Sequence, residues 1–293
     1  VGYVDGQIVI NPTVAQREHS RLKLTVAGTM EKVTMIEAGA DEIPNDTMLD
    51  CIKAGHEEIK KLCKFIEGIK EEVGKPKFEY VSFATDKDVY AEIKENFKER
   101  MYQDVQAVDK EVRDANMDKL AEDIQAYFVE KYGEEETEAK STEIANSIHD
   151  LEKECVREMI FKEHKRPDGR RIDEIRPLSC EVGVLPRVHG SAIFTRGQTQ
   201  VLSVVTLGTK SEEQELDGLD EEESKRYMHQ YNFPSYSVGE ARPSRGPGRR
   251  EIGHGALAEK ALVPVIPSED EFPYTIRVVS EVLSSNGSTS QAS

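Results

Sequence analysis

An α+β fold is predicted by this 293-residue sequence, in the order β-rich, helical and β-rich again. Apolar residues alternate with polar ones in the first 40 residues and again after residue 166, as in half-buried strands. Between about residues 86 and 165 they recur at every third or fourth position, and this stretch contains no proline and one glycine, Gly133. A chain of this length is expected to form two or three domains.

The first segment predicts strands followed by one helix. Residues 7–10 precede an Asn-Pro turn signal, and the alternation over residues 22–26 and 33–37 indicates a hairpin. Asn45 or Asp46 is expected to cap the helix that follows, because both side chains accept hydrogen bonds from free backbone N–H groups. The apolar positions of this helix are Leu49, Ile52, Ile59, Leu62, Ile66 and Ile69.

The middle segment predicts a small all-helical domain of about three amphipathic helices. Pro76 ends the preceding unit, so we place the first domain at residues 1–74 and the helical domain at residues 75–160. Three consecutive acids at 134–136 are expected in a solvated loop between helices rather than at a metal site. The apolar positions that recur at helical spacing include Val89, Ile93, Phe97, Leu120, Ile124, Phe128, Ile144, Ile148, Leu151 and Cys155.

The third segment, residues 161–293, predicts a second β-rich domain. It begins at residues 166–170 (RPDGR), where proline and Asp-Gly provide turn chemistry. An acidic stretch at 212–223 is expected as an exposed loop or hairpin tip, and a helix is expected over residues 256–262. Strands are expected over residues 178–184, 191–195, 200–207 and 274–283.

Composition narrows the possible functions. A formal net charge of −17 argues against nonspecific coating of nucleic acid, although it leaves room for a local basic cleft. No apolar run reaches the roughly 18–20 residues of a membrane span, and the four cysteines form no C-x-x-C pair. We therefore expect reduced thiols in a cytoplasmic protein, without structural zinc or a disulfide framework. Because the chain begins at Val1 and breaks off at Ser293, we also expect it to be part of a longer protein.

An arginine-rich loop is the strongest local signal for function. Residues 242–250 hold four arginines and no acid, and guanidinium groups bind phosphate bidentately. Arg249 and Arg250 lie close to the start of the predicted helix, where free N–H groups also favour anions. The alternative is a solvated basic loop. His254 follows closely, either as a site residue or as a structural hydrogen-bond donor.

A second signal is the Gly/Ser/Thr turn at residues 286–290, after the last predicted strand. Its hydroxyls and backbone N–H groups suit a phosphate, although such turns are common and no Walker A sequence is present. Arg196 is expected on a tight turn between two strands, either at the site or merely exposed. No catalytic triad and no metal-binding cluster is evident from the spacing.

Five motifs in this order resemble the polynucleotide phosphorylase family. They are residues 185–191 (LPRVHGS), 194–200 (FTRGQTQ), 231–240 (YNFPSYSVGE), 249–255 (RREIGHG) and 277–293. The resemblance implies that residues 1–74 end a first RNase PH-type domain and residues 75–160 form its all-helical linker domain. Residues 161–293 would begin a second, catalytic RNase PH-type domain.

The resemblance also implies an activity. Family members are phosphate-dependent 3′-to-5′ exoribonucleases that release nucleoside diphosphates, reversibly, with Mg²⁺ or Mn²⁺ as cofactor and inorganic phosphate as co-substrate. They act on single-stranded RNA in mRNA decay, form homotrimers and join RNA-decay assemblies. No membrane is involved.

Site roles follow from the resemblance, residue by residue. Ser288, Thr289 and Ser290 match the phosphate-binding run, with threonine where the family usually has serine. Arg249 and Arg250 match arginines that hold RNA phosphates and balance charge in the transition state, and His254 matches a histidine lining the same site. Arg196 is expected as a further RNA contact. The family's metal-binding aspartates and accessory RNA-binding domains are expected beyond Ser293, so the isolated chain is expected to be inactive.

Two other functions are compatible with the same motifs. A noncatalytic ring subunit would bind RNA and scaffold partners, but it would not need the arginine pair and the serine run. A hydrolytic exoribonuclease would place water where phosphate binds, and the serine run disfavours it. The identity of the released nucleotide distinguishes these possibilities.

Overall fold

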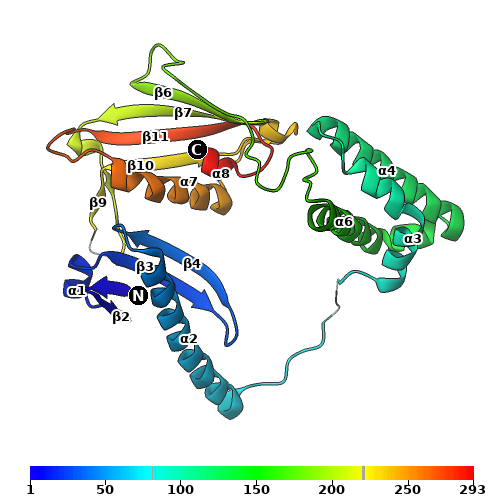
Figure 1. Ribbon diagram of the computed structural model, residues 1–293, viewed down its shortest axis with the longest axis horizontal. Coiled ribbons are helices and arrows are strands. Elements are labelled where there is room, and N and C mark those ends of the chain that lie inside the picture. Colours follow the sequence, from blue (N-terminus) through cyan, green and yellow to red (C-terminus); the bar gives the residue numbers. More distant parts are fainter. Residues whose placement is uncertain (81, 83, 220–221) are drawn as a thin grey trace. The chain divides into compact units, whose positions relative to one another are not determined.

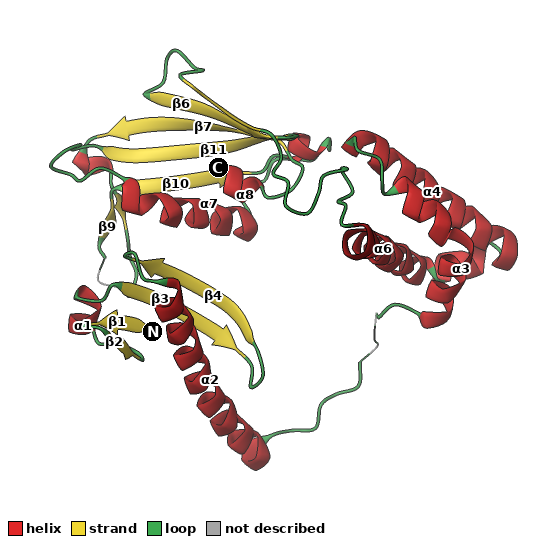
Figure 2. Ribbon diagram, in the orientation of Figure 1, coloured by secondary structure: helices red, strands yellow, loops and turns green. Residues whose placement is uncertain are grey.

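The computed structural model describes residues 1–80, 82, 84–219 and 222–293. The chain divides into two compact units, Val1–Val81 and Ser82–Ser293. Strands, then helices, then strands again follow one another along the chain (Figures 1 and 2), which confirms the predicted α+β order.

The first unit contains a four-stranded antiparallel sheet and one long helix. The predicted hairpin is confirmed, because β3 pairs with β4 from Leu22↔Ala40 to Gly28↔Val33. A small core of Leu22, Leu24 and Cys51 joins the sheet to α2. The elements are β1 (Gly2–Val4), β2 (Gln7–Val9), α1 (Val14–Glu18), β3 (Leu22–Gly28), β4 (Val33–Ala40) and α2 (Asn45–Val73), with sheet order β2-β1-β3-β4.

The start of α2 differs from the prediction. Asn45 and Asp46 lie inside the helix, and the capping position is Pro44, which has no side chain able to accept a hydrogen bond. Proline is compatible with this place because its fixed φ suits the entry to a helix. The helix therefore begins without the side-chain cap that the sequence suggested.

The middle of the chain folds into helices, as predicted. They are α3 (Lys87–Asp104), α4 (Lys110–Tyr132), α5 (Glu134–Ala139) and α6 (Ser141–Glu158), followed by a π-helical turn, η1 (Met159–Glu163). Asp86 and Asp109 cap α3 and α4 by accepting hydrogen bonds from backbone N–H groups. The acids at 134–136 open α5 instead of forming a loop, where their charges favour a helix N-terminus.

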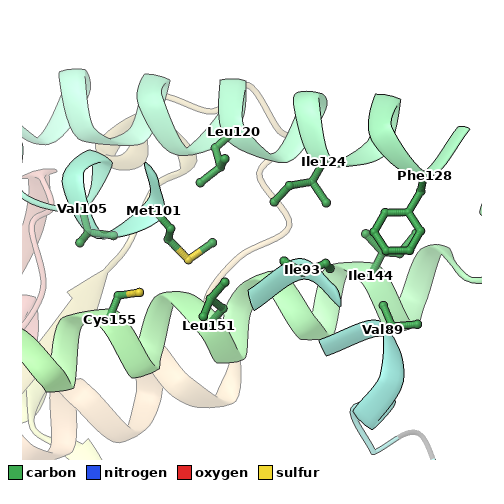
Figure 3. Close-up of a cluster of buried hydrophobic side chains, with 10 residues drawn as sticks. All are labelled: Val89, Ile93, Met101, Val105, Leu120, Ile124, Phe128, Ile144, Leu151 and Cys155. Atoms are coloured by element: carbon green, nitrogen blue, oxygen red, sulfur yellow. The ribbon is translucent and has the colours of Figure 1, made fainter. Parts of the chain in front are cut away.

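The helices enclose one apolar core (Figure 3). Leu120, Ile124 and Phe128 of α4 are at most 1% exposed, and they face α3 and α6. Their spacing of four residues is the pattern that predicted the helix. The other residues labelled in this core are Val89, Ile93, Met101, Val105, Ile144, Leu151 and Cys155.

The last part of the chain forms a five-stranded mixed sheet with the order β10-β11-β7-β6-β5. β10 pairs with β11 in parallel, and the other neighbours are antiparallel. Four strands match the predicted segments, and β10 was not predicted. The strands are β5 (Leu178–Val182), β6 (Gly190–Arg196), β7 (Thr199–Gly208), β10 (Tyr227–Asn232) and β11 (Thr275–Ser284).

Shorter elements complete this region. β8 (Gln214–Glu215), in the predicted acidic stretch, pairs with β9 (Ser224–Lys225), directly after it, to form a small hairpin; residues 220 and 221 of the stretch lie outside the described residues. Helix α7 spans Arg249–Leu262 and so begins seven residues before the predicted start at 256. The remaining elements are η2 (Lys210–Glu212), η3 (Ser235–Val238), η4 (Val263–Val265) and α8 (Thr289–Ala292).

Candidate functional site

The N-terminus of α7 carries the arginine pair. Arg249 and Arg250 are its first two residues, and both are exposed. The carboxylate of Glu251 fixes this end of the helix, since one oxygen accepts the N–H of Gly248 at 2.7 Å and the other accepts the N–H of Phe233 at 2.8 Å. Glu251 therefore ties the start of the helix to the end of β10. The backbone that carries the Arg249 and Arg250 side chains is fixed in this way.

Gly255 brings α7 against β10. A Cβ at this position would lie 2.9 Å from the carbonyl oxygen of His229 and 3.3 Å from the amide nitrogen of Tyr231. Only glycine permits this approach without moving the backbone. His254 thereby contacts the ring of Tyr231 edge to face, with ring centroids 5.2 Å apart and planes at 69°.

Tyr231 links this helix to the serine run. Its hydroxyl and the Oγ1 atom of Thr289 lie 2.5 Å apart, and both residues are buried. Burial raises the pKa of Tyr231, while the hydrogen bond with Thr289 and the positive charge of Arg250 act in the opposite direction. The phenol therefore stays protonated near neutral pH and can donate to the threonine hydroxyl.

These contacts enclose a cavity of about 170 Å³, which we call the histidine cavity. Three residues predicted for the site, Arg250, His254 and Thr289, line it together. The Nδ1 atom of His254 is buried and has no hydrogen-bond partner, so it is free to meet a ligand. The lining is completed by Tyr231, Phe233 and Glu251.

Ser288 of the serine run lies with Arg196 at a different cavity. Ser288 adopts the left-handed conformation with φ 49°, and its side chain is exposed. The carbonyl of Gly287 accepts hydrogen bonds from Arg196 Nη2 at 2.7 Å and from Thr199 Oγ1 at 3.2 Å. Arg196 and Ser288 line a cavity of about 350 Å³ beside this loop. Arg249 and Ser290 line neither cavity.

Several residues of the site were not found from the sequence. Tyr231 was missed because β10 was missed, although its alternate residues Tyr227, His229 and Tyr231 are buried and show the two-residue period of a strand. Glu251 carried a signal as well, since an acid three residues after Gly248 is the pattern of a capped helix start. The long-range contact of Tyr231 with Thr289 had no signal in the sequence.

Among the residues that the structure describes, no cluster is suited to hold a divalent metal ion. Within residues 1–80, 82, 84–219 and 222–293, no group of three or more His, Cys, Asp or Glu side chains is placed to hold one. The carboxylate at the histidine cavity, Glu251, has both oxygens occupied by backbone N–H groups. Among the same residues, no helix has the length and apolar character needed to cross a membrane.

Three family models match this chain in succession. The model described as "3′ exoribonuclease family, domain 2" matches residues 1–58, and "Polyribonucleotide nucleotidyltransferase, RNA binding domain" matches residues 88–171. "3′ exoribonuclease family, domain 1" matches residues 174–293, which include every lining residue of the histidine cavity.

Relatives align with the whole chain. The polyribonucleotide nucleotidyltransferase of Caldicellulosiruptor saccharolyticus is 62% identical over 293 residues, which is 100% of this chain and 41% of that protein. Those of Ruminiclostridium cellulolyticum and Clostridioides difficile are 59% and 57% identical with the same coverage. The chain belongs to the polyribonucleotide nucleotidyltransferase family.

Membership in this family confirms the predicted resemblance. It identifies the two β-rich segments as RNase PH-type and the helices between them as the family's helical domain. The chain spans 41% of the length of these relatives.

Proposed function

We propose that the complete gene product containing this chain is a phosphate-dependent 3′-to-5′ exoribonuclease. One observation carries the proposal: Arg250 and His254 of α7 meet Thr289 of α8 at one cavity. In the reaction, an oxygen of inorganic phosphate attacks the 3′-terminal phosphodiester of RNA. The bond to the 3′ oxygen of the preceding nucleotide breaks, that oxygen takes a proton, and a nucleoside diphosphate leaves.

The arginine pair would supply positive charge. Phosphoryl transfer requires positioning and electrostatic stabilisation more than covalent help from the protein. Phosphate and phosphodiester together bring several negative charges, and Arg250 at the histidine cavity is placed to offset them. Arg249, the exposed first residue of α7, lines neither cavity and would hold an RNA phosphate farther from the reacting atoms. His254 would contact a phosphate oxygen through its unpaired Nδ1 atom.

The serine run would hold the phosphate through two of its three hydroxyls. Ser288 is exposed and Ser290 half-buried, so we assign phosphate binding to them. Thr289 is buried against Tyr231 and would fix the loop through that hydrogen bond. For Arg196, the bond to Gly287 favours a role in positioning the same loop over the direct RNA contact expected from the sequence.

The wider organisation is proposed on the family resemblance. It comprises the domain limits 1–74, 75–160 and 161–293, a homotrimer acting on single-stranded RNA in cytoplasmic mRNA decay, and partners in an RNA-decay assembly. Reversibility and the cofactor, Mg²⁺ or Mn²⁺, are proposed on the same basis. No ligand set for the cation occurs among the described residues, and no step above depends on it.

The test is product identity. The complete gene product is incubated with poly(A) and Mg²⁺, with and without phosphate, and the released nucleotides are separated by chromatography. ADP that appears only with phosphate supports phosphorolysis. AMP in both conditions means hydrolysis, and the absence of any nucleotide favours a noncatalytic ring subunit.

A pair of variants tests the site. Arg250→Gln should lower the phosphorolysis rate by roughly 10²–10³, the usual cost of removing one well-placed donor. Arg245→Gln is the matched control, because Arg245 is exposed in the loop just before α7 and lines neither cavity. Equal losses in the two variants would mean that the loop contributes only diffuse positive charge.

A further inference from the structure

A second glutamate of α7 holds the C-terminal half of this helix against the sheet. The Oε2 atom of Glu259 accepts the backbone N–H of His229 in β10 at 3.0 Å. The Oε1 atom accepts the ammonium group of Lys225, in β9, at 2.7 Å. The Glu259 side chain is only 16% exposed. Glu259 therefore fastens one end of α7 to β10, as Glu251 fastens the other.

Both glutamates bond to the unpaired side of β10. This strand is at the edge of the sheet, with β11 as its neighbour on one side. The carbonyl of Arg226, just before the strand, faces β11, because it accepts the N–H of Ile276. Backbone groups of successive residues alternate between the two sides of a strand, so the N–H groups of His229 and Phe233 point away from β11. The carboxylates of α7 are their acceptors.

The two bonds have the same spacing along the helix and along the strand. Glu251 and Glu259 are eight residues apart, which is about 12 Å along a helix axis. Their partners, Phe233 and His229, are four residues apart, about 13 Å along a strand. The order of the partners is reversed, so α7 runs antiparallel to β10, beside which it lies (Figure 1). Gly255, midway between the glutamates, makes the close approach to the strand.

This match holds α7 in one register on β10. A shift of the helix by one residue would move each carboxylate about 1.5 Å along the axis and about 100° around it. Both hydrogen bonds would then break, and Gly255 would leave the place where a Cβ does not fit. A single bond at the first turn would still let the helix tilt. The bond of Glu259 to His229 therefore fixes the direction of α7.

The direction of α7 matters for the histidine cavity. Arg250 and His254 lie on a helix face next to the one that meets β10. They line the cavity with Thr289 of α8, whereas Glu259 does not line it. A tilt or rotation of α7 would therefore change the distance of the guanidinium and the imidazole from Thr289.

We propose that Glu259 is a positioning residue for phosphorolysis, which acts through α7 without touching the substrate. This inference rests on the proposed function. The bond to the N–H of His229 holds Arg250 and His254 where the reaction needs them. The competing explanation is that Glu259 only stabilises the fold through its ion pair with Lys225. It predicts a lower free energy of unfolding and an unchanged rate for each folded molecule.

Three variants of the complete gene product separate these explanations. Glu259→Met keeps the length of the side chain but has no oxygen to accept the N–H of His229. Glu259→Gln keeps a carbonyl oxygen for this N–H and loses the charge. Lys225→Met is the matched control, because it removes the ion pair and leaves the bond to His229 in place. The kcat of phosphorolysis and the KM for poly(A) are measured for each variant, on protein shown to be folded by circular dichroism.

The positioning role predicts a distinct order of rates. Glu259→Met should lower kcat roughly ten- to a hundredfold, because a misplacement of about 1 Å can cost that much, and should change the KM for poly(A) far less. Glu259→Gln should restore most of the rate. Lys225→Met should stay within about threefold of the wild type, as expected for a partly exposed ion pair. Equal losses in Glu259→Met and Lys225→Met would overturn the proposal, as would an unchanged kcat in Glu259→Met.

Hydrogen exchange gives a readout that does not depend on activity. Peptides from α7 and β10 should exchange faster in Glu259→Met than in Lys225→Met, and peptides from α4 should be unchanged. If Glu259→Met does not fold, Glu259→Asp replaces it, since it keeps the charge but is one methylene too short to reach His229. A rate equal to that of the wild type in Glu259→Asp would then overturn the proposal. Failure of the proposed function is recognised separately, because the wild type itself would release no ADP in the presence of phosphate.

Discussion

Replacing Gly255 with alanine tests the close approach of α7 to β10. The added Cβ would lie 2.9 Å from the carbonyl oxygen of His229 and 3.3 Å from the amide nitrogen of Tyr231. Both atoms belong to a strand that is paired along its length with β11, so the helix must move outward. Overpacking of this kind costs about 1–3 kcal/mol. The higher helix propensity of alanine returns about 1 kcal/mol, so the free energy of unfolding should fall by about 0–2 kcal/mol.

Gly253 provides the matched control in the same helix. It is exposed, and a Cβ added there meets nothing within 4 Å. Gly253→Ala should therefore raise the free energy of unfolding by about 0.5–1 kcal/mol. Because both variants share the gain in propensity, the difference between them isolates the contact and should be about 1–3 kcal/mol.

Urea denaturation followed by circular dichroism measures this difference, with the m-value compared between variants. Hydrogen exchange of peptides from α7 and β10 then shows whether the loss is local. Gly255→Ala should also slow phosphorolysis, since it displaces His254 from Tyr231. Equal stability of the two alanine variants would refute the close approach, and with it our account of how His254 is positioned.

Three further outcomes are expected from measurements of unfolding free energy. Leu120→Ala, at a fully buried position of α4, should cost about 2–5 kcal/mol, while Val112→Ala, at a position of the same helix that is 53% exposed, should cost far less. Lys94 and neighbouring donors lower the pKa of Glu154 to about 2. The contribution of this carboxylate to the free energy of unfolding is therefore present above its unfolded pKa and is lost as pH falls towards 2. Glu154→Gln should reduce that loss of stability, measured by urea denaturation at several pH values. Burial lowers the pKa of His229, so the unfolded chain takes up a proton first as pH falls below about 6.5, and the free energy of unfolding declines. His229→Gln should reduce this decline. An unchanged dependence of the unfolding free energy on pH would contradict the prediction.

Elements with a strong apolar period were predictable from the sequence. The helices of the middle segment followed from residues such as Leu120, Ile124 and Phe128, which recur every four positions and are all buried. The hairpin of β3 and β4 followed from alternation. β10 was not predicted because the residues on its buried face, Tyr227, His229 and Tyr231, carry polar atoms. These atoms are satisfied by hydrogen bonds in the fold, but in the sequence they make the strand look less apolar than its burial requires.

The start of α7 was missed for a related reason. Its apolar period is clear only from Ala256 onward, whereas its first turn is held by the hydrogen bonds of Glu251 to Gly248 and Phe233. The correct start places Arg250 and His254 four residues apart on one helix, and therefore on the same face. The sequence located these residues near one another but could not show this shared face.

The serine run shows why the remaining part of the site was beyond prediction. Gly287 and Ser288 both have positive φ. A short Gly/Ser/Thr sequence does not impose this conformation by itself. Arg176, Arg196 and Thr199 donate to the backbone carbonyls of Asn286 and Gly287, and Tyr231 holds Thr289 at the histidine cavity. Each of these contacts joins segments at least 58 residues apart. The loop conformation is thus a property of the folded sheet rather than of the local sequence.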